Sequence, residues 1–104
     1  MATLTWSLTA RRDLQAVFDY VSDDDPDRAI AFVDGLIAAA ERLREFPRSG
    51  RVLPEFERSG WREVVANNYR IIYSINGQRV VVHAVLHGSM SLLSQAAKRE
   101  WPTN

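Results

Sequence analysis

The sequence predicts an α+β protein in which a helical hairpin packs on a small, mainly antiparallel β-sheet. Two stretches in the first half repeat apolar residues at helical spacing, and an Asp-Pro step separates them. Three stretches in the second half have strand character, and Asn76-Gly77 joins the last two as a hairpin turn. The predicted order is β-α-α-β-β-β with a short C-terminal helix. The 104 residues favour a single domain, residues 1–104.

The chain opens with a predicted strand and an amphipathic helix. Thr3–Ser7 alternates, with Leu4 and Trp6 on one face, as a half-buried strand does. Thr9 is of a residue type that caps helices, so we expect a helix over residues 10 to about 22. Its apolar stripe consists of Ala10, Leu14, Val17, Phe18 and Val21. This spacing indicates one face buried in a core.

A second, longer helix follows directly. Asp25 is a natural N-cap and Pro26 a natural first helical residue, so we expect the helix to begin at Pro26. We expect it to run to about Phe46, where Pro47 stops it. Its apolar positions are Ala29, Val33, Leu36, Ile37, Ala40 and Leu43, with Ile30 and Phe32 on the flanks. The short connection between the helices predicts an antiparallel hairpin.

The second half reads as a turn-rich loop and a meander. The loop "PRSGRVLPEFERSG" contains a short extended piece around Val52–Leu53. The predicted strands are Trp61–Ala66, Tyr69–Ile75 and Arg79–Leu86, and the predicted last helix is Leu92–Trp101. Consecutive strands of this kind pair antiparallel. The first strand pairs at one edge of the sheet or inserts into it.

Composition excludes several kinds of site. The chain has no cysteine, which removes disulfides and thiolate chemistry. We expect no cofactor, and no metal either, because the acids around Asp25 lack the glycine and distal glutamate of a calcium loop. The N-terminus does not resemble a signal peptide, and no stretch approaches the roughly 20 apolar residues of a membrane span. We therefore expect a cytoplasmic protein.

Charge is segregated along the chain although the net charge is zero. Residues 1–45 contain nine acids and five bases, and residues 46–104 contain four acids and eight bases, so the halves carry −4 and +4. Almost all of the bases are arginine, which suits carboxylate or phosphate partners. Either the second half forms a basic face for an acidic partner, or the two halves neutralise each other across the fold.

The hairpin strands carry polar residues that raise the question of RNA cleavage. A metal-free nuclease needs a general base, a general acid and cations on the phosphate. Alternation places His83 and His87 on one face of their strand with Arg79, Val81 and Val85, opposite Val80, Val82, Ala84 and Leu86. If the sheet face away from the helices is partly open, Arg62, Arg70, His83 and His87 are the candidate catalytic set.

Each of these residues also has a structural interpretation. His83 lies in a valine-rich run, where a histidine with a satisfied hydrogen bond is common. His87 closes a strand, where a histidine often bonds a turn. Arg70 can pair with Glu63 on the neighbouring strand.

Short motifs in order along nearly the whole chain resemble the RelE/ParE superfamily of bacterial toxins. They are an N-terminal Trp strand with Ala10-Arg11-Arg12-Asp13-Leu14, then "FVDGLIAAAERLREFPRSG", then Arg62-Glu63, Asn68–Tyr73 and Val80–Gly88. RelE-like members are ribosome-dependent mRNA endonucleases that use several basic residues. ParE-like members are associated with poisoning DNA gyrase. This chain looks more like the ParE-like group, because its only lysine is Lys98 and because Met90 stands where the superfamily usually has an arginine.

The resemblance implies a ParE-like toxin of a type II toxin–antitoxin system, a class linked to plasmid stabilisation. Such a toxin binds DNA gyrase and is neutralised by a ParD-like antitoxin, which alone contacts DNA in a toxin–antitoxin hetero-oligomer. On this interpretation the hairpin histidines are not catalytic and the protein is not an enzyme. The alternatives are a RelE-like ribosome-dependent mRNA endonuclease and a non-toxic relative that still binds an antitoxin.

The implied antitoxin segment folds as it binds, with a helix in an apolar groove and a strand that extends the sheet. A groove rimmed by arginines would suit an acidic segment. The candidate contacts are apolar anchors and charge partners: Phe32, Leu36, Leu53, Phe56, Trp61, Arg62, Arg70 and Arg79.

Overall fold

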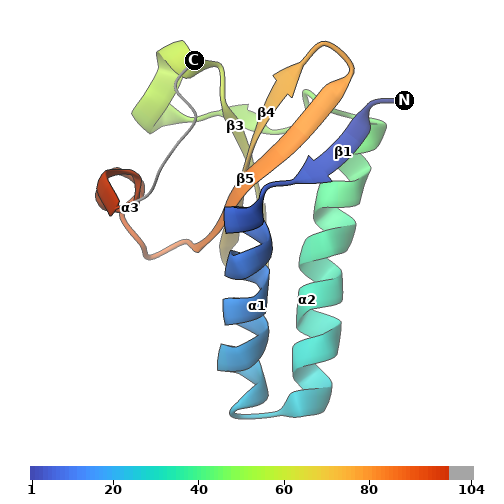
Figure 1. Ribbon diagram of the computed structural model, residues 1–104, viewed down its shortest axis with the longest axis vertical. Coiled ribbons are helices and arrows are strands. Elements are labelled where there is room, and N and C mark those ends of the chain that lie inside the picture. Colours follow the sequence, from blue (N-terminus) through green and yellow to red (C-terminus); the bar gives the residue numbers. More distant parts are fainter. Residues whose placement is uncertain (99–104) are drawn as a thin grey trace.

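Figure 1 shows a computed structural model of the chain, which describes residues 1–98. The helices are α1 (Leu8–Ser22), α2 (Pro26–Glu41) and α3 (Leu92–Lys98), with 3-10 turns η1 (Arg42–Arg44) and η2 (Pro54–Ser59). The strands are β1 (Thr3–Trp6), β2 (Arg51–Val52), β3 (Arg62–Ala66), β4 (Tyr69–Asn76) and β5 (Arg79–His87). This order confirms the predicted fold class.

One five-stranded sheet has the order β1-β5-β4-β3-β2. The first strand, whose place the sequence left open, lies at one edge and pairs parallel with β5, with Leu4 beside Val80. All other pairs are antiparallel. The β3–β4 turn is formed by Asn67 and Asn68, which both have positive φ, a conformation that asparagine tolerates better than most residues.

Helices α1 and α2 lie side by side as an antiparallel hairpin that projects beyond the end of the sheet (Figure 1). Helix α1 begins at Leu8, so the prediction that Thr9 caps it was wrong. Ser7 is the cap: its Oγ accepts from the Ala10 N–H at 3.0 Å, while its own N–H donates to the Val82 carbonyl at 3.0 Å. Ser7 therefore both bonds to β5 just after the end of β1 and caps α1.

Helix α2 begins as predicted and ends earlier than predicted. Asp25 caps it, because its Oδ1 accepts from the N–H groups of Asp27 and Arg28 at 3.1 and 3.2 Å. It ends at Glu41 rather than near Phe46, and η1 completes the turn before the loop.

A β-bulge at His83 changes which face the second half of β5 presents. Ile72 pairs with Ala84 and Tyr73 pairs with Val82, so His83 has no partner in the β4–β5 register. Val82 and Val85 consequently pack on the helix side, and Ala84 packs on the other side. The predicted alternation through β5 was therefore wrong beyond Val82, and it no longer places His83 and His87 on one face.

The sheet is buried on both faces. The core under the helices contains Leu4, Ala10, Val17, Val21, Ala29, Leu36, Ala40, Leu43, Ile71, Tyr73, Val80, Val82 and Val85. The second core, on the other face, contains Leu53, Trp61, Ile72, Ala84, Leu86 and Leu92, with Phe56 beside it. The η2 segment and the start of α3 thus cover most of the face that the sequence left partly open. No described helix is long and apolar enough to cross a membrane.

Candidate functional site

Arg70 lies in a network of ion pairs on the second face of the sheet. Its Nη1 and Nη2 each donate to one carboxylate oxygen of Glu55 at 3.0 Å, and its Nε donates to Glu63. Glu63 also accepts from Nε of Arg51. The Glu63 side chain is fully buried, and the Arg70 side chain is 12% exposed. Arg70 therefore has a bidentate carboxylate and a second carboxylate inside its own chain.

These bonds leave Arg70 poorly suited to hold a phosphate. Hydrogen bonds from Arg70 lower the pKa of Glu55, and the same bonds raise the pKa of Arg70, so both groups stay charged at neutral pH. Two arginines and two glutamates make the network neutral overall. An incoming anion would have to displace a carboxylate from Arg70. The structural interpretation, an Arg70–Glu63 pair, is confirmed.

His83 is packed between Trp61 and Ser74 at the bulge. Its imidazole stacks on the Trp61 indole with ring centroids 4.3 Å apart and planes 3° from parallel, and its Nε2 lies 2.7 Å from the Ser74 Oγ. Burial lowers the pKa of His83 to about 4, so the ring is neutral at physiological pH. His83 is therefore a structural residue of the sheet whose hydrogen bond is satisfied. This is the structural interpretation given for it from the sequence.

His87 closes the turn after β5. Its Nδ1 lies 3.1 Å from the Ser89 N–H, which donates to it, and 2.6 Å from the Ser89 Oγ. Its ring meets the Tyr69 ring edge-on at 5.2 Å. Nδ1 therefore acts as the acceptor of a backbone hydrogen bond in this turn. This is the turn contact that the structural interpretation of His87 expected.

Arg62 and the "FPRSG" motif hold the loop before β2. The Tyr73 hydroxyl donates to the Pro47 carbonyl at 2.8 Å and accepts from the Gly50 N–H at 2.9 Å. Nη1 of Arg62 donates to the Gly50 carbonyl at 2.7 Å. A Cβ on Gly50 would lie 2.5 Å from both the Glu63 carbonyl oxygen and the Tyr73 hydroxyl, so this close approach requires glycine. Arg62 and Tyr73 therefore stabilise the loop.

The residues proposed from sequence as partner contacts do not form one surface. Leu36 is fully buried in the core under the helices, and Leu53 and Trp61 are 0% and 5% exposed in the second core. These three side chains stabilise the fold. Phe32 and Phe56 are half-buried on opposite sides of the sheet, and Arg79 is exposed at the start of β5.

Two of the four candidate nuclease residues share a hollow. A hollow of about 410 Å³ at the open end of the second face is lined by Arg51, Glu63, Val65, Asn68, Arg70, His87, Gly88 and Ser89. Its described lining includes Arg70 and His87 but not Arg62 or His83. A base, an acid and free cations are therefore not assembled at one point.

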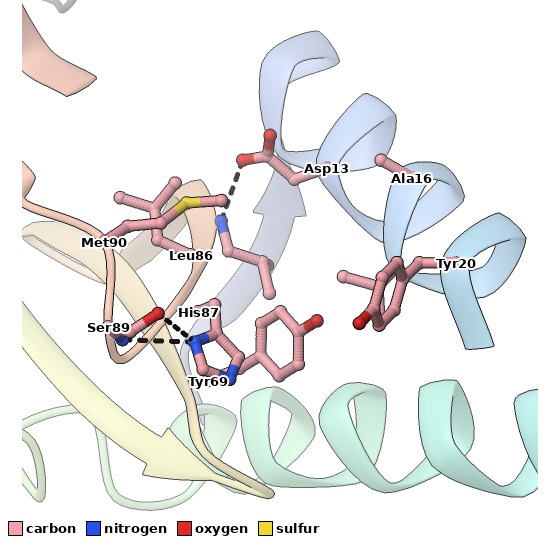
Figure 2. A pocket seen from close by; sticks show the side chains of 10 residues that line it. Asp13, Ala16, Tyr20, Tyr69, Leu86, His87, Ser89 and Met90 are labelled. Atoms are coloured by element: carbon pink, nitrogen blue, oxygen red, sulfur yellow. Dashed lines mark hydrogen bonds between the residues drawn. The ribbon is translucent and has the colours of Figure 1, made fainter.

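A larger groove of about 530 Å³ opens between α1 and the end of β5, and we call it the tyrosine groove (Figure 2). Its lining is Asp13, Ala16, Val17, Tyr20, Tyr69, Val85, Leu86, His87, Ser89 and Met90. Tyr20 and Met90 are 76% and 46% exposed, whereas Val17 and Val85 are buried. The groove thus has an apolar floor with two large accessible side chains above it.

Strand pairing and one side chain from α1 position this groove. The parallel β1 ends its pairing with β5 at Val82, and beyond it the Val85 N–H donates to Oδ2 of Asp13 at 2.9 Å. Tyr69 meets the Phe32 ring edge-on at 5.7 Å, and its hydroxyl faces that of Tyr20 (Figure 2). Burial, and the nearby Tyr20, raise the pKa of Tyr69, so its hydroxyl stays a neutral donor and acceptor.

The tyrosine groove was not predicted from the sequence. Ala16 and Tyr20 each precede a residue of the α1 stripe, Val17 and Val21, by one position. Their own helical spacing could have indicated a second apolar strip on α1. Met90 was noted only as a departure from the superfamily arginine. No group of three or more acidic or histidine side chains in the described part of the chain is arranged to hold a metal ion.

Comparison with known proteins identifies the family. Residues 4–92 match the family described as the ParE toxin of the type II toxin–antitoxin system parDE. This chain belongs to the ParE toxin family. "Toxin ParE3" of Caulobacter vibrioides is 32% identical over 88 residues, which are 84% of this chain and 87% of that protein. The "Putative toxin Y4kP" of Sinorhizobium fredii is 33% identical over 100 residues, 95% of this chain and 92% of the relative.

Solved structures share the fold of this ParE-family toxin. A chain of the "Chromosomal ParDE TA system from P. aeruginosa" superposes with a TM-score of 0.71 at 22% identity, covering 84% of this chain and 96% of that one. A chain of the toxin–antitoxin complex RelBE2 from Mycobacterium tuberculosis superposes with a TM-score of 0.57 at 28% identity, covering 83% and 96%. The superfamily resemblance stated from the sequence motifs is therefore confirmed.

Proposed function

We propose that this ParE-family toxin acts by binding and poisoning DNA gyrase in the cytoplasm, and that a ParD-like antitoxin neutralises it. The toxin–antitoxin pair would contribute to plasmid stabilisation. Family membership supports the toxin class. The structural neighbours are described as toxin–antitoxin systems, which supports an antitoxin partner.

The state of Arg70 is the observation that favours a binding toxin over a nuclease. Its guanidinium is occupied by Glu55 and Glu63, and its side chain is 12% exposed. His83 is neutral and stacked, and Arg62 holds a loop carbonyl. RNA cleavage requires a proton acceptor, a proton donor and cations on one phosphate. This arrangement favours a toxin that acts by binding its target through a surface over a toxin that cleaves RNA.

Pulse labelling and a purified target test the proposal together. The chain is induced alone in a susceptible bacterium, and DNA and protein synthesis are followed over the first minutes. We expect DNA synthesis to fall first, and the purified chain to inhibit supercoiling by purified gyrase. His83→Gln and His87→Gln, checked for folding by circular dichroism, should both retain toxicity.

The opposite outcomes select the alternatives. An early fall in protein synthesis, with ribosome-dependent mRNA cleavage that His87→Gln abolishes, would establish the RelE-like endonuclease. No effect on either synthesis, together with tight binding of the antitoxin, would establish the non-toxic relative.

A further inference from the structure

We propose that one end of the molecule, which we call the arginine end, binds the phosphate backbone of duplex DNA without regard to its sequence. The arginine end consists of Arg42, Arg48, Arg62 and Arg79. Which DNA it meets rests on the proposed function, because gyrase holds the duplex that the toxin would encounter. The binding itself follows from how the structure distributes its charges.

Segments that are far apart in sequence meet at the arginine end. The Ala2 N–H donates to the Arg44 carbonyl at 2.8 Å, and the next residue, Thr3, pairs with Arg79 in the parallel register of β1 and β5. Arg42 is the first residue of η1, so it lies at the same end. Figure 1 shows the amino terminus, the last turn of α2 and the β4–β5 turn together at one end of the long axis.

The loop before β2 extends this end. Nη1 of Arg62 donates to the Gly50 carbonyl at 2.7 Å and to the Arg48 carbonyl at 3.4 Å. These acceptors are neutral, so they do not compensate the charge of the half-buried Arg62, and Arg48 itself is exposed. The loop thus adds two positive charges to the end that η1 and β5 form.

Ion pairs divide the arginines of the chain into two groups. Within the described part of the chain, ion pairs with carboxylates are formed by Arg28, Arg44, Arg51 and Arg70. The four members of the arginine end form none with the described residues, and Glu45 is the one acid in residues 42–48. Four arginines and one glutamate give this end a net charge of +3, which is available to an anion from outside.

The opposite end of the molecule is acidic. Residues 19–28, around the α1–α2 turn, contain five aspartates and one arginine, a net charge of −4. The 16 residues of α2 separate the two ends by about 24 Å. These two groups of charges therefore do not neutralise each other across the fold, and they form a dipole along the long axis (Figure 1). Near a polyanion, the arginine end turns toward the partner and the acidic end turns away.

The residue type and its placement favour phosphates over base edges. A guanidinium binds a phosphate through two parallel N–H donors. The four arginines lie in a 3-10 turn, in a loop and at the first residues of two strands, rather than along one face of a helix that could enter the major groove. Duplex DNA carries one negative charge per roughly 1.7 Å of its axis, so it can offer a phosphate to each of them. Phosphate contacts carry no sequence information directly.

This contact would be made by the toxin itself. The superfamily resemblance assigned DNA contact to the antitoxin alone. The arginine end predicts that the toxin also holds the duplex on which gyrase acts, while the acidic end points away from the DNA.

Titration of a fluorescein-labelled duplex with the full-length chain tests the proposal. Fluorescence anisotropy is measured over a range of salt concentrations. Four phosphate contacts predict a slope of about −3.6 in a plot of log K against log salt, which is about a tenfold loss of affinity for each doubling of salt. Duplexes of different sequence should bind equally.

Single-charge variants locate the contact. Arg42→Gln, Arg48→Gln and Arg79→Gln should each weaken binding and make the slope shallower by about one. Arg28→Gln removes the same charge at the acidic end and should leave the slope unchanged. Arg62 is left as it is, because it also holds the loop before β2. Circular dichroism and the urea midpoint confirm that each variant is folded.

Experiments with purified gyrase separate DNA contact from protein contact. The triple variant, with glutamine at positions 42, 48 and 79, should bind gyrase in the absence of DNA as the wild type does. It should inhibit the supercoiling of relaxed plasmid several-fold more weakly. Phe46, which is 58% exposed in the same segment, is the apolar control, and Phe46→Ala should keep both DNA binding and gyrase binding.

The inference is overturned if the chain does not bind the duplex at low salt, or if Arg48→Gln and Arg28→Gln have equal effects. Loss of DNA-free gyrase binding in the triple variant or in Phe46→Ala also overturns it, because the arginine end would then dock a protein.

Failure of the proposed function gives a different result. A chain that binds the duplex through the arginine end but does not inhibit gyrase refutes the function alone. A chain that inhibits gyrase equally well as wild type and triple variant, and binds no duplex, refutes this inference alone.

Discussion

Replacing His83 with Gln should remove a pH dependence of folding that the wild-type chain shows in mild acid. Unfolded histidine titrates at about 6.5, and burial lowers the pKa of His83 in the folded chain to about 4. Between these values the unfolded chain binds the extra proton and the folded chain does not. The stability contributed by neutral His83 is therefore complete above about pH 6.5 and is lost as the pH falls toward 4.

The size of the effect follows from the two pKa values. Each pKa unit corresponds to about 1.36 kcal/mol, so the loss by pH 4 is no more than about 3 kcal/mol. Inside the window the slope approaches about 1.4 kcal/mol per pH unit. A few kcal/mol is a large part of the total stability of a domain of this size, because such domains unfold with roughly 5–15 kcal/mol.

Urea unfolding of the wild-type chain and His83→Gln between pH 4.5 and 8 measures this difference. Carboxylates such as Glu55 titrate in both proteins, so their contributions cancel in the difference between the two free energies. Ser74→Ala should keep the pH dependence, because burial rather than the Ser74 bond causes the shift. A difference that is flat with pH, or that grows in favour of the wild type as pH falls, would refute the reasoning.

Three further substitutions test contacts that hold the fold. Arg70→Met should cost about 3–5 kcal/mol, because it leaves the buried Glu63 with a single exposed arginine; Arg70→Met with Glu63→Met should recover part of that loss. Tyr73→Phe should cost about 1–3 kcal/mol, because the Gly50 N–H loses its acceptor. Ser7→Ala should cost about 1 kcal/mol through loss of the α1 cap. Urea midpoints measure all three, and losses under about 0.5 kcal/mol would contradict the assigned contacts.

The residue types of Asn76-Gly77 predicted the hairpin turn. Periodicity located both helices of the hairpin, because each helix buries one face in the core. It misplaced the start of α1, because the choice between Ser7 and Thr9 as cap depends on a bond from Ser7 to Val82 across the sheet. Such a contact between residues far apart in sequence leaves no local pattern.

The candidate site was harder to predict, because a single β-bulge interrupts the alternation of side chains along β5. An alternating strand places His83 and His87 on one face, but the unpaired His83 shifts the rest of β5 by one residue. His83 then stacks on Trp61, and His87 meets Tyr69. Bulges depend on the packing of both strands. The tyrosine groove was missed for a related reason: it joins α1 to the end of β5, which are about 70 residues apart in the chain.

Most of the motif residues that identify the family stabilise this fold. Arg70 and Glu63 form the buried ion network, and Tyr73 with Gly50 fixes the loop before β2. Loss of toxicity in Arg70→Ala would therefore report unfolding unless stability is measured beside it.

Tyr20 is different, because it is 76% exposed and its truncation costs the fold little. If Tyr20→Ala keeps its urea midpoint and still escapes the antitoxin, neutralisation acts through the tyrosine groove. If it is neutralised as the wild type is, the antitoxin binds elsewhere.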